Sequence, residues 1–316
     1  MPSDDATSSQ TTSKVGAVWG GMDQATLDAA YDQTVYAPNR RQILDRFAAS
    51  SERVRQRLGA PLRFAYGSGE RERMDVYPAA SSTPAPVQIF IHGGAWRSGL
   101  AERYGFPAET FVRAGAHFVV PDFDWVQDHD GDLMPIADQI RRAIAWVWHN
   151  ADSFGGDRNR IHLSGHSSGA HMAAVALTTD WPVAFDVPAD AIKSALLCSG
   201  MYEMRPVRLS ARSTYVTFSD ESEAALSPMR HLETVAPPLV VAYGTLETPE
   251  FKRQSADFAD AMTARGHPVR LLIAEHCNHF EILETLANPY GLLGAAALDQ
   301  MTVNRMEPEV AGSARR

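Results

Sequence analysis

The sequence predicts one large α/β domain, a doubly wound and mostly parallel sheet of about eight strands between two layers of helices. Two observations lead to this prediction. Short apolar runs alternate with helical patterns through most of the chain, and a Gly-x-Ser-x-Gly pentad stands between a strand-like and a helix-like segment. A chain of 316 residues with 45% apolar and 21% charged residues can bury the core that such a domain requires.

The chain divides into four predicted parts. Residues 1–13 are rich in Ser, Thr and Asp and are expected to form a disordered lead. Residues 14–61 form an N-terminal helical appendage, residues 62–306 the α/β domain, and residues 307–316 a loose tail. Within the domain, the polar and irregular stretch 201–237 is a candidate cap segment.

The appendage contains two predicted helices. Residues 27–36 form the shorter one, and Gly59 and Pro61 end the longer one. An apolar stripe with helical spacing defines the longer helix: Leu44, Phe47, Ser51, Val54 and Leu58. The appendage could cover the mouth of a pocket or simply cap the sheet, and the sequence leaves both open.

Eight short apolar runs are the predicted strands. The first two are separated by a turn-rich Gly-Ser-Gly, which indicates an antiparallel hairpin. The later runs alternate with helices at 136–148, 170–177 and 249–265, which favours parallel connections. The strands are predicted at 62–66, 74–77, 87–91, 116–120, around Ile161, and at 192–197, 239–243 and 269–273.

Composition excludes several functions. A net charge of −9 argues against a nucleic-acid partner, and no apolar run is long enough to span a membrane. The first residues show no basic region followed by an apolar one, so we expect no secretory signal and a cytoplasmic protein. The two cysteines, Cys198 and Cys277, are expected to be reduced thiols. Dinucleotide and P-loop motifs are missing, so no cofactor is expected. A homo-oligomer remains open.

The pentad Gly165-His166-Ser167-Ser168-Gly169 is typical of a nucleophile elbow, in which a sharp strand-to-helix turn exposes a serine hydroxyl. Serine needs a base to remove its proton and an acid to orient that base. In this architecture the acid and the histidine follow the serine in that order along the chain. Ser167 is therefore the candidate nucleophile.

Two later strand ends carry the candidate acid and base. Glu247 follows the strand 239–243, with Glu250 as an alternative three residues on. His279 follows the strand 269–273 and precedes a new amphipathic run that would hold it rigidly, and His276 is the alternative. We expect no metal here, because His276, Cys277 and His279 lack a fourth ligand of suitable spacing.

A fourth strand end, His92-Gly93-Gly94, offers backbone N–H groups that no side chain obstructs. Together with the N–H of Ser168, the amides of Gly93 and Gly94 could hold the negative oxygen of a tetrahedral intermediate. His92 itself is predicted to be structural, as are His166 and His171. Aromatic residues expected near the mouth could line an apolar pocket or belong to the core: Trp96, Phe123, Trp125, Tyr202 and Phe280.

These motifs together resemble the α/β-hydrolase superfamily, in its esterase and lipase branch. Two further stretches, GTLETPEFKRQS at 244–255 and NHFEILE at 278–284, are similar to those of kynurenine formamidases (arylformamidases). The likeness spans roughly residues 66–285 and implies Ser167 as nucleophile, Glu247 as acid and His279 as base. The family often has Asp at the acid position, and its usual Tyr and basic residue after residue 121 are replaced by an acidic, aromatic loop at 122–130.

The resemblance implies a serine hydrolase that removes a small acyl or formyl group from an aryl amide or ester. A carboxylesterase of broad small-ester specificity is the alternative within this class, because pentad and triad are the same for both. A non-catalytic binding module on the same scaffold is the alternative from another class. A complete set of candidate residues speaks against that module. The expected partner is a small-molecule substrate.

Overall fold

A computed structural model describes residues 16–302, so the predicted lead 1–13 and tail 307–316 lie outside the described residues. Eight strands form one sheet in the order β1-β2-β4-β3-β5-β6-β7-β8. The strands are β1 Leu62–Ala65, β2 Arg73–Tyr77, β3 Ala85–Ile91, β4 His117–Pro121, β5 Gly156–His166, β6 Ile192–Cys198, β7 Leu239–Gly244 and β8 Val269–Ala274.

The predicted hairpin and parallel connections are both confirmed. β2 pairs antiparallel with β1 and with β4, whereas the five pairings from β4 across to β8 are parallel. Each predicted strand is found within two residues of its expected ends, except that β5 begins earlier, at Gly156. The sheet is therefore the mostly parallel one that the sequence predicts.

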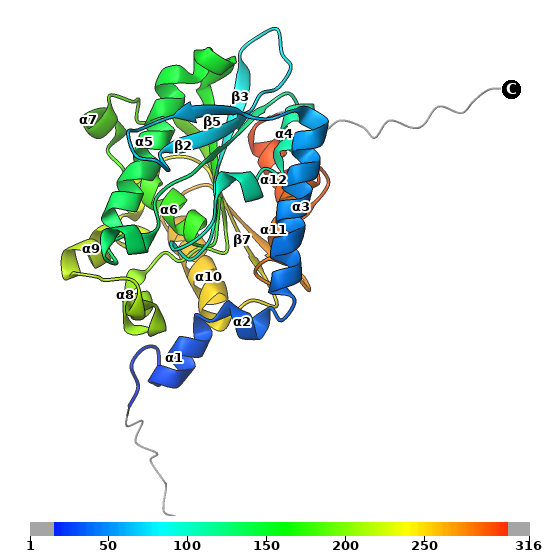
Figure 1. The fold of residues 1–316 in the computed structure, drawn as a ribbon. Coiled ribbons are helices and arrows are strands. Elements are labelled where there is room, and N and C mark those ends of the chain that lie inside the picture. The colour runs from blue at the N-terminus through cyan, green and yellow to red at the C-terminus, as the bar shows by residue number, and fades with distance from the viewer. Residues whose placement is uncertain (1–15, 303–316) are drawn as a thin grey trace, which may run out of the picture.

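Helices cover both faces of the sheet (Figure 1). The α-helices are α1 Gln24–Ala30, α2 Gln33–Tyr36, α3 Arg40–Leu58, α4 Ala108–Arg113, α5 Met134–Asn150, α6 Ser168–Leu177, α7 Trp181–Phe185, α8 Met204–Leu209, α9 Asp220–Ala225, α10 Pro249–Ala264, α11 Glu281–Glu284 and α12 Leu292–Gln300. Short 3₁₀ turns join them: η1 Ala101–Arg103, η2 Val126–His129, η3 Ala151–Phe154, η4 Ala211–Thr214, η5 Pro228–Arg230, η6 Leu232–Thr234 and η7 Thr285–Ala287.

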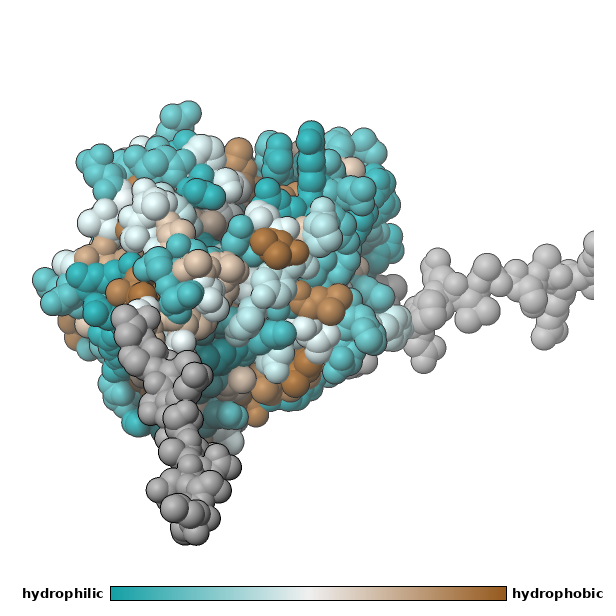
Figure 2. Space-filling model, turned by 90° about the horizontal axis from the view of Figure 1, so that it is seen from below, coloured by the Kyte–Doolittle hydropathy of each residue, from teal (hydrophilic) through white to brown (hydrophobic). Residues whose placement is uncertain are grey.

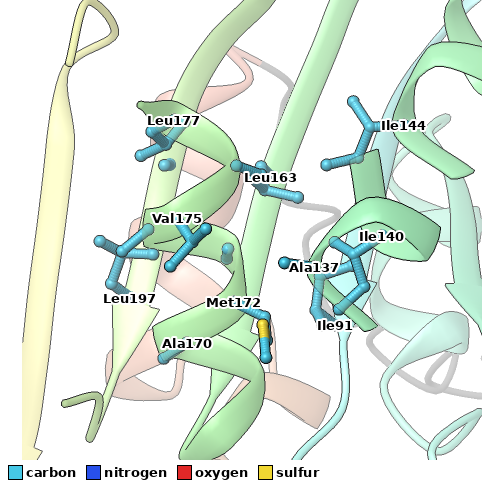
Figure 3. Close-up of a cluster of buried hydrophobic side chains, with 14 of the residues drawn as sticks. Ile91, Ala137, Ile140, Ile144, Leu163, Ala170, Met172, Val175, Leu177 and Leu197 are labelled. Atoms are coloured by element: carbon cyan, nitrogen blue, oxygen red, sulfur yellow. The ribbon is translucent and has the colours of Figure 1, made fainter. Parts of the chain in front are cut away.

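The core consists of two apolar layers, one on each face of the sheet. Alternate residues of a strand point to opposite faces, so β6 sends Leu197 into the layer beneath α1, α5, α6 and α10 and sends Leu196 into the layer beneath α3, α4, α11 and α12. The close-up of the first layer shows Leu163 of β5 between Leu177 of α6 and Ile144 of α5 (Figure 3). The central helix α6 is buried along its whole length.

The N-terminal helices join both layers. Leu27 of α1 belongs to the first layer and Phe47 of α3 to the second. In α3 the side chain that reaches the core from the first turn is Ile43, whereas the predicted Leu44 is only partly buried, because the helix faces the sheet at a slightly different angle. Gly59 ends α3 at a positive φ of 88°, which favours glycine.

The segment 201–237 contains α8, α9 and three 3₁₀ turns. It lies next to α1 at the lower end of the molecule (Figure 1), where Gln24 Nε2 donates to the Leu209 carbonyl at 2.8 Å and the Ala211 amide donates to Asp28 Oδ1 at 2.6 Å. Seen from below, this end is mostly hydrophilic, with hydrophobic residues in small separate groups (Figure 2). The N-terminal helix and the candidate cap are therefore hydrogen-bonded to each other.

Candidate active site

Ser167 lies at the turn between β5 and α6. Its φ of 59° and ψ of −126° are strained for a residue with a side chain. The turn is tight because a Cβ at Gly169 would collide with the carbonyl oxygens of Ile91 and His92. The Ser167 amide donates to the Cys198 carbonyl at 2.9 Å, which ties the turn to β6. These constraints hold the hydroxyl at the carboxyl edge of the sheet.

A chain of hydrogen bonds joins three of the predicted site residues. Glu247 Oε2 lies 2.6 Å from His279 Nδ1, and His279 Nε2 lies 2.8 Å from Ser167 Oγ. A carboxylate only accepts, so Nδ1 carries the proton, and Nε2 is free to accept from the serine hydroxyl. Glu247 is fully buried, and His279 and Ser167 are 2% and 8% exposed.

The alternative acid and base lie elsewhere. Glu250 pairs with Arg253, at 2.7 and 2.8 Å, and accepts from the Tyr31 hydroxyl at 3.0 Å. His276 is exposed, with a positive φ of 61°. The geometry therefore brings Glu247 and His279, rather than these alternatives, to the serine.

Two further groups donate hydrogen bonds to the other carboxylate oxygen of Glu247, Oε1. Ser199 Oγ donates to Oε1 at 2.6 Å, and the Gly244 amide donates to the same atom at 2.7 Å. Ser199 follows β6 directly and has a positive φ of 55°. Ser199 is not among the site residues that the sequence predicts, although a polar residue at the carboxyl end of a parallel strand is a signal that indicates such a role.

Two buried histidines brace the site, as the sequence predicts. His166 Nε2 donates to the His279 carbonyl at 2.7 Å, and burial together with the neighbouring His279 holds the pKa of His166 well below its usual range. His171 accepts from Trp96 Nε1 at 3.2 Å and donates to the Leu226 carbonyl at 2.8 Å. His171 therefore connects the loop after β3 to the segment 201–237.

The three residues predicted to form the oxyanion hole lie at the elbow turn and in the loop beside it. Gly93 lies against Ser167, because a Cβ at Gly93 would be 3.1 Å from the serine Cβ. Gly94 has a φ of 131°, and a Cβ there would collide with the Ser98 carbonyl. The amides of Gly93, Gly94 and Ser168 donate to no acceptor among residues 16–302. These three N–H groups remain available to a ligand.

His92 supports this loop from behind. Its ring stacks on Phe123, with centroids 4.4 Å apart, and its Nδ1 donates to the Gly93 carbonyl at 2.8 Å. Burial lowers the pKa of His92, so the neutral ring is favoured. His92 is therefore structural, as the sequence predicts.

The aromatic residues predicted to line a pocket occupy different places. Trp96 is buried beside His171, and Phe280 is partly exposed beside His279, at 5.1 Å between ring centroids. Tyr202 is fully buried and stacks on Phe258 of α10, at 4.3 Å. Trp125 lies beneath the Arg71 guanidinium at 4.0 Å. Contact of any of these residues with a substrate stays a prediction.

Three aspartates of the acidic loop at 122–130 form hydrogen bonds or ion pairs with other residues of the protein. Asp124 accepts from Gln139 at 2.7 Å and lies 3.2 Å from His129, and Asp128 pairs with Arg71 at 2.6 Å. The loop residue Asp122 is buried and accepts from the Ala101 amide at 2.5 Å. The carboxylates of Asp122, Asp124 and Asp128 therefore stabilise the conformation of this loop.

Among residues 16–302 no cluster of His, Cys, Asp or Glu could hold a metal ion. Cys198 and Cys277 are both free, and burial raises the pKa of each thiol. No helix in the described part of the chain is long and apolar enough to cross a membrane.

Comparison with solved structures identifies the class of protein. A candidate thioesterase from a Silicibacter species is 25% identical and has a TM-score of 0.75, covering 86% of this chain and 98% of its own. An esterase from Pyrobaculum calidifontis has a TM-score of 0.65 at 17% identity, covering 88% and 97%. A family model described as BD-FAE matches residues 74–195, and one for the prolyl oligopeptidase family matches residues 135–289. The fold and the strand–serine–helix turn are those of an α/β hydrolase.

Curated relatives narrow the class. The kynurenine formamidase of Danio rerio is 30% identical over 287 residues, which are 87% of this chain and 95% of that protein. The kynurenine formamidase of Salmo salar is 33% identical over 245 residues, covering 75% and 81%. The chain therefore belongs to the kynurenine formamidase family, and it is a hydrolase of the arylformamidase-like or carboxylesterase type.

Proposed function

We propose that this hydrolase removes a small acyl or formyl group from an aryl amide or ester through an acyl-enzyme, with Ser167 as the nucleophile. The observation that carries the proposal is the buried chain from Ser167 Oγ through the His279 ring to Glu247, at 2.8 and 2.6 Å. A nucleophile, its base and an orienting acid within hydrogen-bond reach are what nucleophilic catalysis requires.

Each step then uses a group already in place. Ser167 Oγ attacks the substrate carbonyl carbon while His279 Nε2 takes the hydroxyl proton, and Glu247 stabilises the imidazolium that forms. The amides of Gly93, Gly94 and Ser168 donate to the developing oxyanion. His279 then protonates the leaving amine or phenol, and water, deprotonated by the same nitrogen, releases the acyl group from the serine.

The aryl formamide is the favoured substrate because two curated relatives, 30% and 33% identical to this chain, are kynurenine formamidases. Aromatic surroundings fit an aryl leaving group, since Phe251 and Phe280 both contact the His279 ring, at 4.8 and 5.1 Å. The alternative is a carboxylesterase for small esters, which the esterase fold neighbour favours. In either case we expect no cofactor and a small-molecule partner, and the cytoplasmic location and a homo-oligomer stay predictions.

The test compares hydrolysis of N-formyl-L-kynurenine with that of p-nitrophenyl acetate. We expect turnover of both, and Ser167→Ala to lower both rates by about 10⁴-fold or more, because the serine, histidine and acid act as a unit. Ester turnover without formamide turnover would support the carboxylesterase. Full activity in the folded Ser167→Ala variant would contradict the assignment of the nucleophile.

A further inference from the structure

One arginine of the segment 201–237 reaches the candidate active site. Arg212, on η4, has its guanidinium carbon 5.6 Å from the Trp96 ring centroid, 5.8 Å from that of Phe251 and 5.8 Å from that of Tyr31. Trp96 follows the oxyanion loop, and Phe251 contacts His279 at 4.8 Å. The Phe251 ring therefore lies between Arg212 and the base His279, and the Trp96 ring lies between Arg212 and the oxyanion loop.

The guanidinium uses only two of its five N–H bonds. Nη1 donates to the Tyr215 hydroxyl at 2.8 Å and Nη2 to the Tyr31 carbonyl at 3.1 Å. Its Nε is buried and has no acceptor among the described residues, and no carboxylate of residues 16–302 lies within 4 Å. A buried guanidinium N–H without an acceptor is costly, which suggests that it serves a ligand.

The two carboxylates near Tyr31, those of Asp32 and Glu250, have hydrogen-bond partners other than Arg212. Asp32 accepts from the Thr34 amide at 2.8 Å, at the start of α2, and the charge of Arg212 contributes, after the Thr34 hydrogen bonds, to the lowered pKa of this carboxyl from beyond 4 Å. Glu250 accepts hydrogen bonds from Nε and Nη2 of Arg253 and from the Tyr31 hydroxyl. Arg212 is thus a cation between aromatic rings, in a protein whose net charge is −9. Such a site attracts an anion, and a guanidinium matches a carboxylate in geometry.

We propose that Arg212 binds a carboxylate on the aryl half of the substrate, away from the bond that is cleaved. Resting on the proposed function, this makes Arg212 a specificity residue that selects anionic aryl amides or esters over neutral ones. The aromatic rings around Arg212 hold the guanidinium in place and pack against the aryl group, while the formyl or acyl group reaches Ser167.

The test uses N-formyl-L-kynurenine and its methyl ester, in which a methyl group replaces the negative charge of the carboxylate. We expect the wild type to prefer the acid in kcat/KM by about 10-fold or more, the worth of a charged hydrogen bond. Arg212→Gln should bring the ratio close to one, and Arg212→Lys should retain part of it. The ratio of the two rates is the readout, because a general loss of activity in a variant lowers both rates equally.

Arg97→Gln is the matched control. The guanidinium carbon of Arg97 lies 4.4 Å from the ring centroid of Tyr215, whose hydroxyl accepts from Arg212. Unlike Arg212, Arg97 is exposed. Its substitution removes the same charge and should leave the ratio within about threefold. If Arg212→Gln slows acid and methyl ester equally, or leaves their ratio unchanged, the proposal is overturned and Arg212 merely joins α1 to η4.

A second readout separates this proposal from the proposed function. If the wild type cleaves p-nitrophenyl acetate but neither formamide, the formamidase assignment fails. The role of Arg212 is then tested by the inhibition of ester hydrolysis by L-kynurenine and by its methyl ester. We expect L-kynurenine to inhibit at least about 10-fold more strongly than its methyl ester, and Arg212→Gln to abolish the difference. Equal inhibition by both compounds in the wild type would overturn the anion site.

Discussion

Ser199 shows how single residues outside the predicted triad prepare the site. Its hydroxyl and the Gly244 amide both donate to Glu247 Oε1, which leaves Oε2 directed at His279. A buried carboxylate that accepts two such bonds keeps one orientation. Ser199 touches neither the substrate carbonyl nor the serine, so it is a positioning residue.

We expect Ser199→Ala to lower kcat by about 10-fold with little change in KM, because the chemistry depends on the orientation of the acid. The free energy of unfolding should fall by about 1 to 3 kcal/mol, since a hydrogen bond to a buried carboxylate is lost. Steady-state kinetics and urea unfolding measure the two effects.

Ser51→Ala is the control for this substitution. Ser51 is fully buried in α3, and its hydroxyl has no hydrogen-bond partner among residues 16–302. Its replacement should leave kcat unchanged and stability the same or slightly higher. A kcat for Ser199→Ala equal to that of the wild type would contradict the positioning role.

At the scale of elements, the site depends on how closely α6 approaches β3. The turn places Gly169 of α6 against the last carbonyls of β3 and the loop that follows, and Gly165 of β5 lies equally close to the backbone of α6. Close packing here brings Ser168 next to the loop after β3, where the Trp96 amide donates to Ser168 Oγ at 3.3 Å. The two pentad glycines are thus required by helix–strand contact.

Gly169→Ala is expected to destabilise the protein by about 3 kcal/mol or more, because backbone atoms cannot move aside as a flexible side chain can. The melting temperature and the yield of folded protein report the loss. Ala173→Gly, at a buried position one turn later in α6, is the control and should cost about 1 kcal/mol. A melting temperature for Gly169→Ala at or above that of Ala173→Gly would refute this explanation of the pentad.

At the scale of the whole molecule, buried histidines couple stability to pH. Burial lowers the pKa of both His162 and His171 to about 4, well below the value of about 6.5 in an unfolded chain. Between pH 6.5 and about 4 the unfolded chain therefore binds protons that the folded protein does not. Stability is fully present above pH 6.5 and falls as the pH falls through this window.

At pH 5 each of these two histidines should lower the free energy of unfolding by about 2 kcal/mol relative to pH 7.5. Urea unfolding at both pH values measures the difference. In His162→Gln the difference should shrink by about 2 kcal/mol, whereas in the exposed His276→Gln it should stay as in the wild type. Equal differences in His162→Gln and the wild type would show that His162 does not contribute.

The sequence by itself determined the strands, the helices between them and the residue at the elbow. Apolar residues with a period of two in strands and of three to four in helices indicate which side of the element is buried. A Gly-x-Ser-x-Gly turn after a strand can adopt few backbone geometries. Polar residues at the ends of parallel strands meet at one edge of the sheet, which is why Ser167, Glu247 and His279 could be named together.

Only the tertiary structure decided between neighbouring candidates. Glu247 and Glu250 are three residues apart, Glu247 in the loop after β7 and Glu250 in the first turn of α10. The contacts of Glu250 come from Tyr31, directly after α1, and from Arg253, one turn further along α10. Tyr202 is placed in the core by Phe258. Arg212 lies in an irregular segment without periodicity, so nothing in its sequence context indicates where its side chain points. Side-chain direction in loops depends on long-range packing, and local pattern does not encode it.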